Sequence, residues 1–319
     1  WNTVRIIIYL ARQIVTISGV VARVHTVAFS GIETLPVEVQ VHVGAGLPAF
    51  TIVGLPDKAV AESRERVRAA LASMGVELPA KKILVNLSPA DVQKEGSHFD
   101  VPIALGLLMA LGLLPSDALD NMVALGELAL DGKLHPVAGV LPAAMGAVAL
   151  GKGIVCPAQN GGEAAYAGEL EILAPATLLA FLNHVKGQQM LSRPQPTMVS
   201  TARPGPDFSQ VRGQTVAKRA LEIAAAGAHN VLMVGPPGSG KSMLAACLPG
   251  ILPPMNAAEI LEVNLIASVA GALMKEGFSS IRPFRDPQHS SSMASMVGGG
   301  RRAVPGEIKK KNKKVLFLD

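Results

Sequence analysis

Valine occupies every second position over residues 37–43, and polar residues fill the positions between. A repeat of two places alternate side chains on opposite faces of the backbone, so this pattern predicts a half-buried strand. A second apolar run covers residues 50–53 and ends at Gly54 and Pro56, which predicts a short strand followed by a turn. The pattern therefore predicts β structure in this part of the chain.

The apolar repeat then lengthens to that of a helix. Asp57 is a favoured capping residue and Gly75 a favoured stop. The apolar positions between them share one helical face: Val60, Val67, Leu71 and Met74. Further along, we predict a strand at 83–87, a buried helix at 101–114, a hairpin turn at 131–132, a helix at 141–150 and a strand at 153–156.

Proline and glycine accumulate over residues 186–206, where large apolar side chains are few, so we predict a linker there. Beyond it, a helix is predicted at 215–226, with Ala217, Ala220, Leu221 and Ala224 on one face. The apolar run 231–234 predicts a strand that enters a glycine-rich turn and another helix. We expect an extension over residues 1–20, a domain over 21–185, the linker over 186–206 and a second domain over 207–319.

Composition narrows the class of protein. Apolar residues make up 49% of the chain and charged residues 17%, which suits a folded protein with a sizeable core. Aromatic residues are only 3%, too few for a surface that binds nucleic acid by base stacking. The two cysteines, Cys156 and Cys247, form no disulfide framework and favour a reducing compartment. We predict no transmembrane helix: Arg5 and Arg12 interrupt the first apolar stretch, and the run 101–114 is too short.

One motif points directly to chemistry. Residues 235–242 fit the pattern G-x-x-x-x-G-K-[ST], and the residues are Gly235, Pro236, Pro237, Gly238, Ser239, Gly240, Lys241 and Ser242. Glycines let a backbone wrap closely around phosphates, and the helix that follows adds its positive end. Lys241 would reach the β- and γ-phosphates of ATP, and the Ser242 hydroxyl would bind Mg²⁺.

A second motif closes the sequence. Residues 315–318 form an apolar run, and Asp319 follows it. A strand that ends in Asp is typical of the Walker B element, whose carboxylate holds Mg²⁺. We therefore predict Ser242 and Asp319 as the metal-binding residues. The acidic residue that usually follows is absent from the printed sequence.

The motifs together resemble one family. They are DFSQVRGQ at 207–214, AKRALEIAAAG at 217–227, LPGILPP at 248–254, RPFR at 282–285, GGG at 298–300, PGEI at 305–308, GLP at 54–56 and KEG at 94–96. From about Ala22 onward the chain is similar to the magnesium-chelatase-like AAA+ ATPases of the ComM (YifB) type. The resemblance implies an α/β protein, in which a ribosomal-protein-S5-like, Lon-protease-like N-terminal domain precedes an incomplete P-loop AAA+ domain.

The resemblance also implies a role. Members of this type form hexameric ring ATPases linked to DNA branch migration during natural transformation. We accordingly expect a cytoplasmic protein that binds ATP and Mg²⁺, with DNA as a partner and no membrane. Val211 and Gly213 would lie beside the adenine. In the Lon-like domain, His98 stands where proteases of that type carry Ser and Leu141 where they carry Lys, and no Lys would activate Ser97. We therefore expect no protease activity.

Three regions depart from the family pattern, and the first is residues 285–290, where the family usually carries Ala-Pro-His-His-Thr. Five lysines precede the Walker B run: Lys309, Lys310, Lys311, Lys313 and Lys314. They are a solvated basic loop, a contact to a phosphate backbone, or an aberration of the sequence. Residues 1–20 have no counterpart in the family, so we expect them to be dispensable. The catalytic Glu, sensor and arginine finger would follow Asp319, so we expect a truncated, hydrolysis-deficient form. The alternatives are a magnesium-chelatase ATPase subunit and a non-enzymatic fragment in which only the N-terminal domain folds stably.

Overall fold

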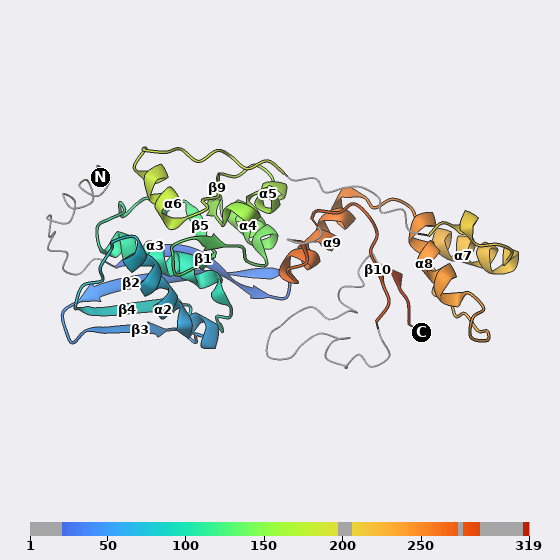
Figure 1. The fold of residues 1–319 in the computed structure, drawn as a ribbon, viewed down its shortest axis with the longest axis horizontal. Coiled ribbons are helices and arrows are strands. Elements are labelled where there is room, and N and C mark those ends of the chain that lie inside the picture. Colours follow the sequence, from blue (N-terminus) through green and yellow to red (C-terminus); the bar gives the residue numbers. More distant parts are fainter. Residues whose placement is uncertain (1–20, 197–205, 274–276, 288–314, 319) are drawn as a thin grey trace. The chain divides into compact units, whose positions relative to one another are not determined.

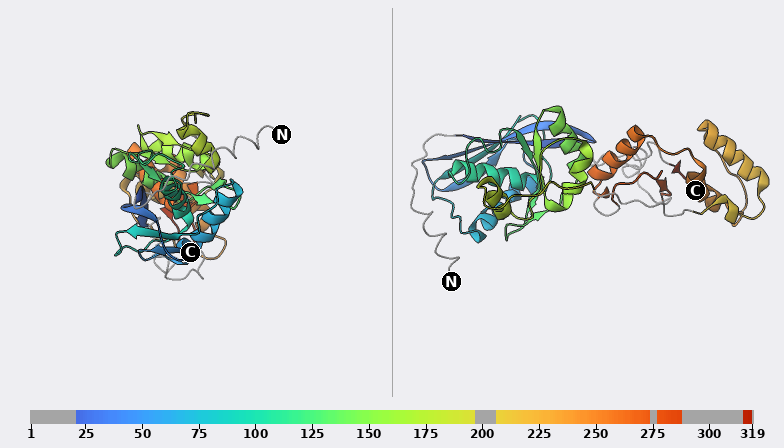
Figure 2. Two further views of the ribbon diagram at one scale, coloured as in Figure 1. Left: turned by 90° about the vertical axis from the view of Figure 1, so that its left-hand side faces the viewer. Right: turned by 90° about the horizontal axis from the view of Figure 1, so that it is seen from above.

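A computed structural model describes residues 21–196, 206–273, 277–287 and 315–318 (Figures 1 and 2). The chain divides into two compact units, residues 1–197 and 198–319. The first is a mixed α/β unit built on a large sheet. The second consists mainly of helices in its described part. The predicted extension, residues 1–20, lies outside the described residues. The five lysines within residues 309–314 also lie outside them.

A seven-stranded sheet forms the centre of the first unit (Figure 1). Its strands are β1 (Ala22–Ser30), β2 (Glu33–Gly44), β3 (Ala49–Val53), β4 (Lys82–Ser88), β5 (Met122–Ala124), β8 (Gly153–Val155) and β9 (Ile172–Leu173). The spatial order is β3-β4-β2-β1-β5-β8-β9. Strand β2 runs antiparallel to both β1 and β4, whereas the other four pairings are parallel. The mixed sheet with helices confirms the α/β class.

Both faces of this sheet are covered. Alternation places Val24 of β1 in one apolar core and Val27 in the other. Helix α3 (Asp100–Ala110) is buried throughout and packs on β1 and β2, where a Cβ on Gly106 would lie 2.7 Å from Val41 Cγ2. Helix α4 (Val140–Ala149) contributes to the second core. Because α3 is buried on every side, its sequence is a nearly continuous apolar run without a polar face.

Helix α2 (Lys58–Ser73) follows the predicted pattern. The Asp57 carboxylate accepts a hydrogen bond of 2.7 Å from the Val60 N–H, as an N-cap should. Arg66 of this helix reaches the buried Asp100 of α3 with two hydrogen bonds, 2.7 and 2.9 Å long. Burial raises the pKa of Asp100, and the bonds from Arg66 oppose that shift. This pair ties α2 to α3, although 34 positions separate the two residues in sequence.

Shorter elements complete the first unit. Strands β6 (Glu127–Leu128) and β7 (Leu134–His135) form an antiparallel pair, and Gly132 between them has a φ of 81°, which confirms the hairpin turn. Helices α5 (Gly161–Ala164) and α6 (Leu178–Val185) follow β8 and β9, respectively, along the chain. A 3-10 turn, η1 (Ser97–Phe99), leads into α3. Two further 3-10 turns, η2 (Ala158–Asn160) and η3 (Ala165–Ala167), flank α5.

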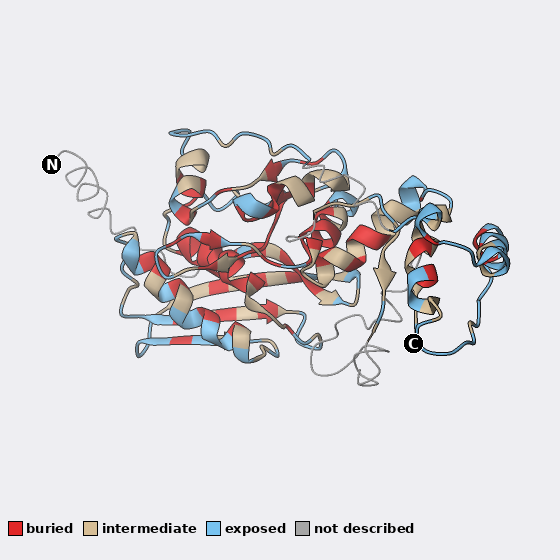
Figure 3. Cartoon of the chain, turned by 45° about the vertical axis from the view of Figure 1, so that its right-hand side comes forward, coloured by how far each residue is buried: buried red, intermediate tan, exposed pale blue. Residues whose placement is uncertain are grey.

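The second unit has little core in its described part. It contains η4 (Phe208–Gln210), α7 (Thr215–Gly227), α8 (Lys241–Ile251), α9 (Ala257–Val269), β10 (Phe284–Arg285) and β11 (Val315–Leu316). Its apolar cluster joins Val211, Leu221, Leu244 and Cys247. Strands β10 and β11 are parallel. Figure 3 shows that α7 is largely exposed, whereas α3 of the first unit is buried along its whole length.

Three predictions about elements need correction. Residues 231–234 form no strand. Within the described part of the second unit, no strand lies beside them. A strand needs hydrogen-bond partners, and apolar character alone does not supply them. The buried helix predicted to reach residue 114 ends at Ala110, because Gly112 adopts a left-handed φ of 71°. Ala220, predicted on the apolar face of α7, is exposed.

Candidate nucleotide-binding site

The glycine-rich loop at residues 235–242 turns directly into helix α8. Gly238 and Gly240 have φ values of 78° and 87°, in the left-handed region that favours glycine. Gly240 precedes the first residue of the helix, and its carbonyl accepts from the Leu244 N–H at 2.9 Å. Helix α8 has eleven residues, so its N-terminus carries the positive end of a helix dipole. The loop and the helix together form a site suited to an anion.

Lys241, the first residue of α8, folds back over this loop. Its Nζ donates hydrogen bonds to the carbonyl oxygens of Gly235, at 2.9 Å, and Pro236, at 3.1 Å. The ammonium group is thus held at the mouth of the loop, where a phosphate oxygen would compete with these carbonyls as acceptor. Ser242 follows in the first turn of α8 and is exposed. The loop residues Gly235 to Gly238 are also exposed.

Val211 and Gly213, predicted to lie beside the adenine, occupy the segment before α7. Val211 is buried against Leu221 of α7 and against α8. Its carbonyl accepts a hydrogen bond from the Lys218 Nζ, and Gly213 adopts a left-handed φ of 68°. The segment is therefore held against α8, the helix that follows the glycine-rich loop.

Gln214 connects the two segments through a hydrogen bond that the sequence pattern did not predict. Its side-chain Nε2 donates a hydrogen bond of 3.2 Å to the Ser239 carbonyl, which belongs to the glycine-rich loop. The residue also has a φ of 55°, which is uncommon outside glycine. The only sequence signal was its place after Gly213 and before the α7 helix.

One predicted component of the site does not take its predicted form, and a second lies outside the described residues. The run 231–234, which was predicted to enter the loop as a strand, has Leu232 and Val234 with 89% and 88% of their surfaces exposed. The predicted metal ligand Asp319 lies outside the described residues. The run that leads to it contributes β11, which pairs with β10, and Phe317 stacks on Phe284 with ring centroids 6.5 Å apart.

In the first unit, two motifs of the family resemblance lie side by side. The Asp57 N–H donates to the Lys94 carbonyl at 2.9 Å, and the Lys94 N–H donates to the Leu55 carbonyl at 3.1 Å. Gly54 approaches β4 so closely that a Cβ would lie 2.2 Å from the Leu87 oxygen. The Lys94 side chain is buried, and burial lowers its pKa. Through these contacts, the two motifs hold the loops around residues 54–57 and 94–96 against each other and against the sheet.

The position of the Lon-type nucleophile carries His98, which is buried. One ring nitrogen, Nε2, lies 2.9 Å from the Val27 carbonyl, so it is the protonated nitrogen of the neutral ring. Burial lowers the pKa of His98 to about 4. Leu141, at the position of the Lon-type lysine, is buried in helix α4. Ser97 donates a hydrogen bond to the Glu127 carboxylate, a pairing that sequence spacing did not indicate.

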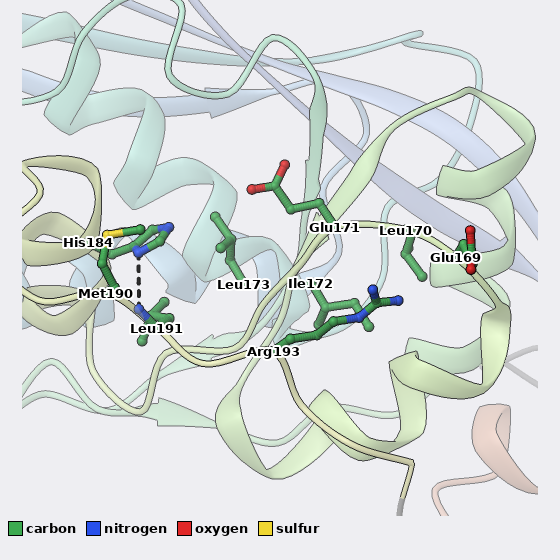
Figure 4. A pocket seen from close by; sticks show the side chains of 9 residues that line it. All are labelled: Glu169, Leu170, Glu171, Ile172, Leu173, His184, Met190, Leu191 and Arg193. Atoms are coloured by element: carbon green, nitrogen blue, oxygen red, sulfur yellow. Dashed lines mark hydrogen bonds between the residues drawn. The ribbon is translucent and has the colours of Figure 1, made fainter.

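A hollow of about 580 Å³ lies in the first unit (Figure 4). It lies beside β9 and the segment after α6, and the His184 Nδ1 there accepts from the Leu191 N–H at 3.1 Å. Figure 4 shows that the charged side chains of Glu169, Glu171 and Arg193 do not converge on one point. This hollow therefore lacks the convergent polar groups of a binding site.

In residues 21–196, 206–273, 277–287 and 315–318, no group of three His, Cys, Asp or Glu side chains is arranged to hold a metal ion. Within the same ranges, no helix has both the length and the apolar character needed to cross a bilayer. Both cysteines are unpaired and buried, and burial raises the pKa of the Cys156 thiol.

Comparisons with known proteins match both units. The family described as "Magnesium chelatase, subunit ChlI" matches residues 207–319, and that described as "Subunit ChlI of Mg-chelatase" matches residues 39–160. The uncharacterized protein YifB of Escherichia coli is 44% identical over 296 residues, which cover 93% of this chain and 58% of YifB. YifB of Salmonella typhimurium is 42% identical, over 93% of this chain and 59% of its own length.

The competence protein ComM of Haemophilus influenzae is 41% identical over 303 residues, which cover 93% of this chain and 60% of ComM. The chain thus spans about three fifths of the length of the curated relatives it matches. The matched residues include the glycine-rich loop at residues 235–242, α8 and the loops of the first unit that carry the family motifs. The chain belongs to the magnesium-chelatase-like family that includes YifB and ComM.

Proposed function

We propose that residues 207–319 bind ATP together with Mg²⁺. The observation that carries the proposal is the geometry at the start of α8. There, two left-handed glycines turn the backbone into the helix, and the Lys241 ammonium is held at the loop carbonyls. Backbone amides of a glycine-rich turn, a helix N-terminus and a lysine ammonium are the elements that bind a phosphate chain.

Each predicted residue has a role in this proposal. The loop amides surround the phosphates, and Lys241 exchanges its two carbonyl partners for β- and γ-phosphate oxygens. Ser242 and Asp319 would hold Mg²⁺, which would neutralise phosphate charge when bound. Val211 and Gly213 lie beside the adenine.

For the whole protein, we propose a DNA-processing ATPase of the cytoplasm. The support is similarity to a relative whose name is competence protein ComM. The family resemblance further supports a hexameric ring, and a Lon-like first unit of ribosomal-protein-S5-like fold that has no protease activity. The buried, neutral His98 at the nucleophile position suits that last point, because neither it nor Leu141 can act as an activated nucleophile or its base.

A second candidate is an ATPase subunit of a magnesium chelatase. Both matching families carry that description, which is the observation that favours it. The two candidates predict different partners for the same nucleotide site. Pull-down of porphyrin-binding chelatase subunits would favour the second candidate, whereas binding to branched DNA in an ATP-dependent manner would favour the first.

Calorimetric titration of the purified chain tests nucleotide binding. We expect Lys241→Ala to weaken ATP binding about tenfold to a hundredfold, because charge-assisted hydrogen bonds to the phosphates are lost. Adenosine has no phosphates and should bind both proteins equally. Lys186→Ala, an exposed lysine in the first unit, is the matched control and should change neither affinity. Equal weakening of ATP and adenosine by Lys241→Ala would contradict the phosphate role.

A further inference from the structure

Gln214 has two features that its position just before helix α7 does not explain. It precedes the first residue of α7 with φ 55° and ψ 33°, a left-handed conformation that costs about 1 kcal/mol in a residue with a Cβ. Ser, Thr, Asp and Asn are the residues that favour this capping position. Within the described residues 206–273, the Gln214 side chain makes no bond to the first turn of α7. It reaches the Ser239 carbonyl instead.

This contact determines which way one peptide group of the phosphate loop faces. A trans peptide holds its C=O and N–H on opposite sides. The Ser239 carbonyl points to Gln214, so the N–H of Gly240 in the same peptide group points away from Gln214. A rotation of that peptide would reverse both groups, and the hydrogen bond from Gln214 opposes the rotation.

The Ser239 hydroxyl supplies an independent observation. Its oxygen is buried and has no hydrogen-bond partner among the described residues. It lies inside the loop, 3.0 Å from the point that a Cβ on Gly235 would occupy. Buried hydroxyl groups are normally hydrogen-bonded, so an unpartnered one inside an anion-binding loop points to a ligand. The carbonyl of Ser239 thus faces Gln214 while its hydroxyl faces the interior of the loop.

We propose that Gln214 is a positioning residue for phosphate binding, which orients the Ser239–Gly240 peptide so that the Gly240 N–H and the Ser239 hydroxyl donate to the phosphates. The inference rests on the proposed nucleotide site. Gln214 also links the two ends of that site, because it directly follows the segment of Val211 and Gly213 that packs on α8. The strained backbone at Gln214 is what carries its side chain across to the loop.

Calorimetry with ADP, pyrophosphate and adenosine tests this role in the full chain. Gln214→Met keeps the length of the side chain and removes the donor. It should weaken ADP and pyrophosphate about twofold to tenfold and leave adenosine unchanged, because one hydrogen bond to the loop is lost. Gln210→Met is the matched control, since Gln210 is an exposed glutamine in the preceding turn. It should bind all three ligands as the parent chain does.

Gln214→Gly separates positioning from a general loss of structure. Glycine relieves the left-handed backbone, so the melting temperature should stay level or rise, while affinity for ADP and pyrophosphate falls as in Gln214→Met. A residue with only a structural role would lose stability and affinity together. If both variants bind ADP as tightly as the parent chain while Lys241→Ala does not, the positioning role is wrong and the proposed function stands. If the parent chain binds no ADP or pyrophosphate, both are wrong.

Discussion

Two apolar segments of similar character, residues 83–87 in the first unit and 231–234 in the second, have opposite environments. In β4, neighbouring strands β2 and β3 pair with both edges, and Leu87 is wholly buried. In the second unit, Leu232 is 89% exposed, and the described residues offer it no neighbouring strand. The comparison shows that a run of apolar residues becomes a strand only where other segments bond to its backbone.

The largest difference between the two units should appear in limited proteolysis. Cleavage requires local opening, and opening is easiest where few apolar contacts hold the backbone. We expect cuts to begin within residues 186–206 and to continue through the second unit, leaving a resistant fragment of the first unit. Mass spectrometry of the fragments measures this. Survival of the second unit as a protected fragment, without nucleotide or partner, would contradict the comparison.

Removal of Arg66 should strongly destabilise the first unit. Arg66→Ala leaves the buried Asp100 carboxylate without its bidentate partner, which costs about 3–5 kcal/mol. Arg64→Ala is the control on the same helix, because Arg64 pairs with Glu65 at the surface and such pairs contribute about 0–1 kcal/mol. Urea denaturation followed by circular dichroism gives both free energies. Similar values for the two variants would show that the buried pair is dispensable.

A pair of leucine substitutions sharpens the comparison of the two apolar segments. Leu87→Ala should lower the free energy of unfolding by about 2–5 kcal/mol, because it creates a cavity in the first core. Leu232→Ala should change it by less than about 0.5 kcal/mol, because little of that side chain is removed from water. The same denaturation assay applies. A large effect at Leu232 would mean that residues 231–234 are packed in solution.

The free energy of unfolding of the first unit should depend on pH through the buried His98. The pKa of His98 is about 4 in the folded chain and about 6.5 when exposed, so the unfolded chain binds the proton first as pH falls. Stability is therefore lost between about pH 6.5 and pH 4, by at most about 3 kcal/mol from this group. His98→Gln should flatten that part of the stability profile, whereas His135→Gln, at an exposed position, should not. Parallel profiles for all three proteins would contradict this assignment.

Features that depend on neighbouring residues were predictable from the sequence. The alternating valines of β2, the Asp57 cap of α2 and the Gly132 turn all appear where the local pattern indicated. The glycine-rich turn into α8 is predictable for the same reason, since its glycines and the start of the helix are adjacent in sequence. The end of helix α3 was misjudged, because a continuous apolar run contains no boundary signal apart from Gly112.

Contacts between distant residues were not predictable in this way. The bond from Gln214 to Ser239, the Arg66–Asp100 pair and the Ser97–Glu127 contact join residues 25 to 34 positions apart. No periodicity records such a separation, and polar residues with these partners look in the sequence like ordinary surface residues. The candidate site was therefore found through its loop, while the residue that orients that loop was missed.

By itself, the sequence determined the family of the protein, the glycine-rich turn into α8 and most of the local elements, because each depends on residues that are close together in the chain. The tertiary structure decided the strand order of the sheet, the burial of His98 and Asp100, and the orientation of the Ser239 carbonyl toward Gln214. It also decided that residues 83–87 are a strand and residues 231–234 are not. The physical reason is the same throughout, since backbone pairing and burial are properties of the neighbours that a segment meets in space.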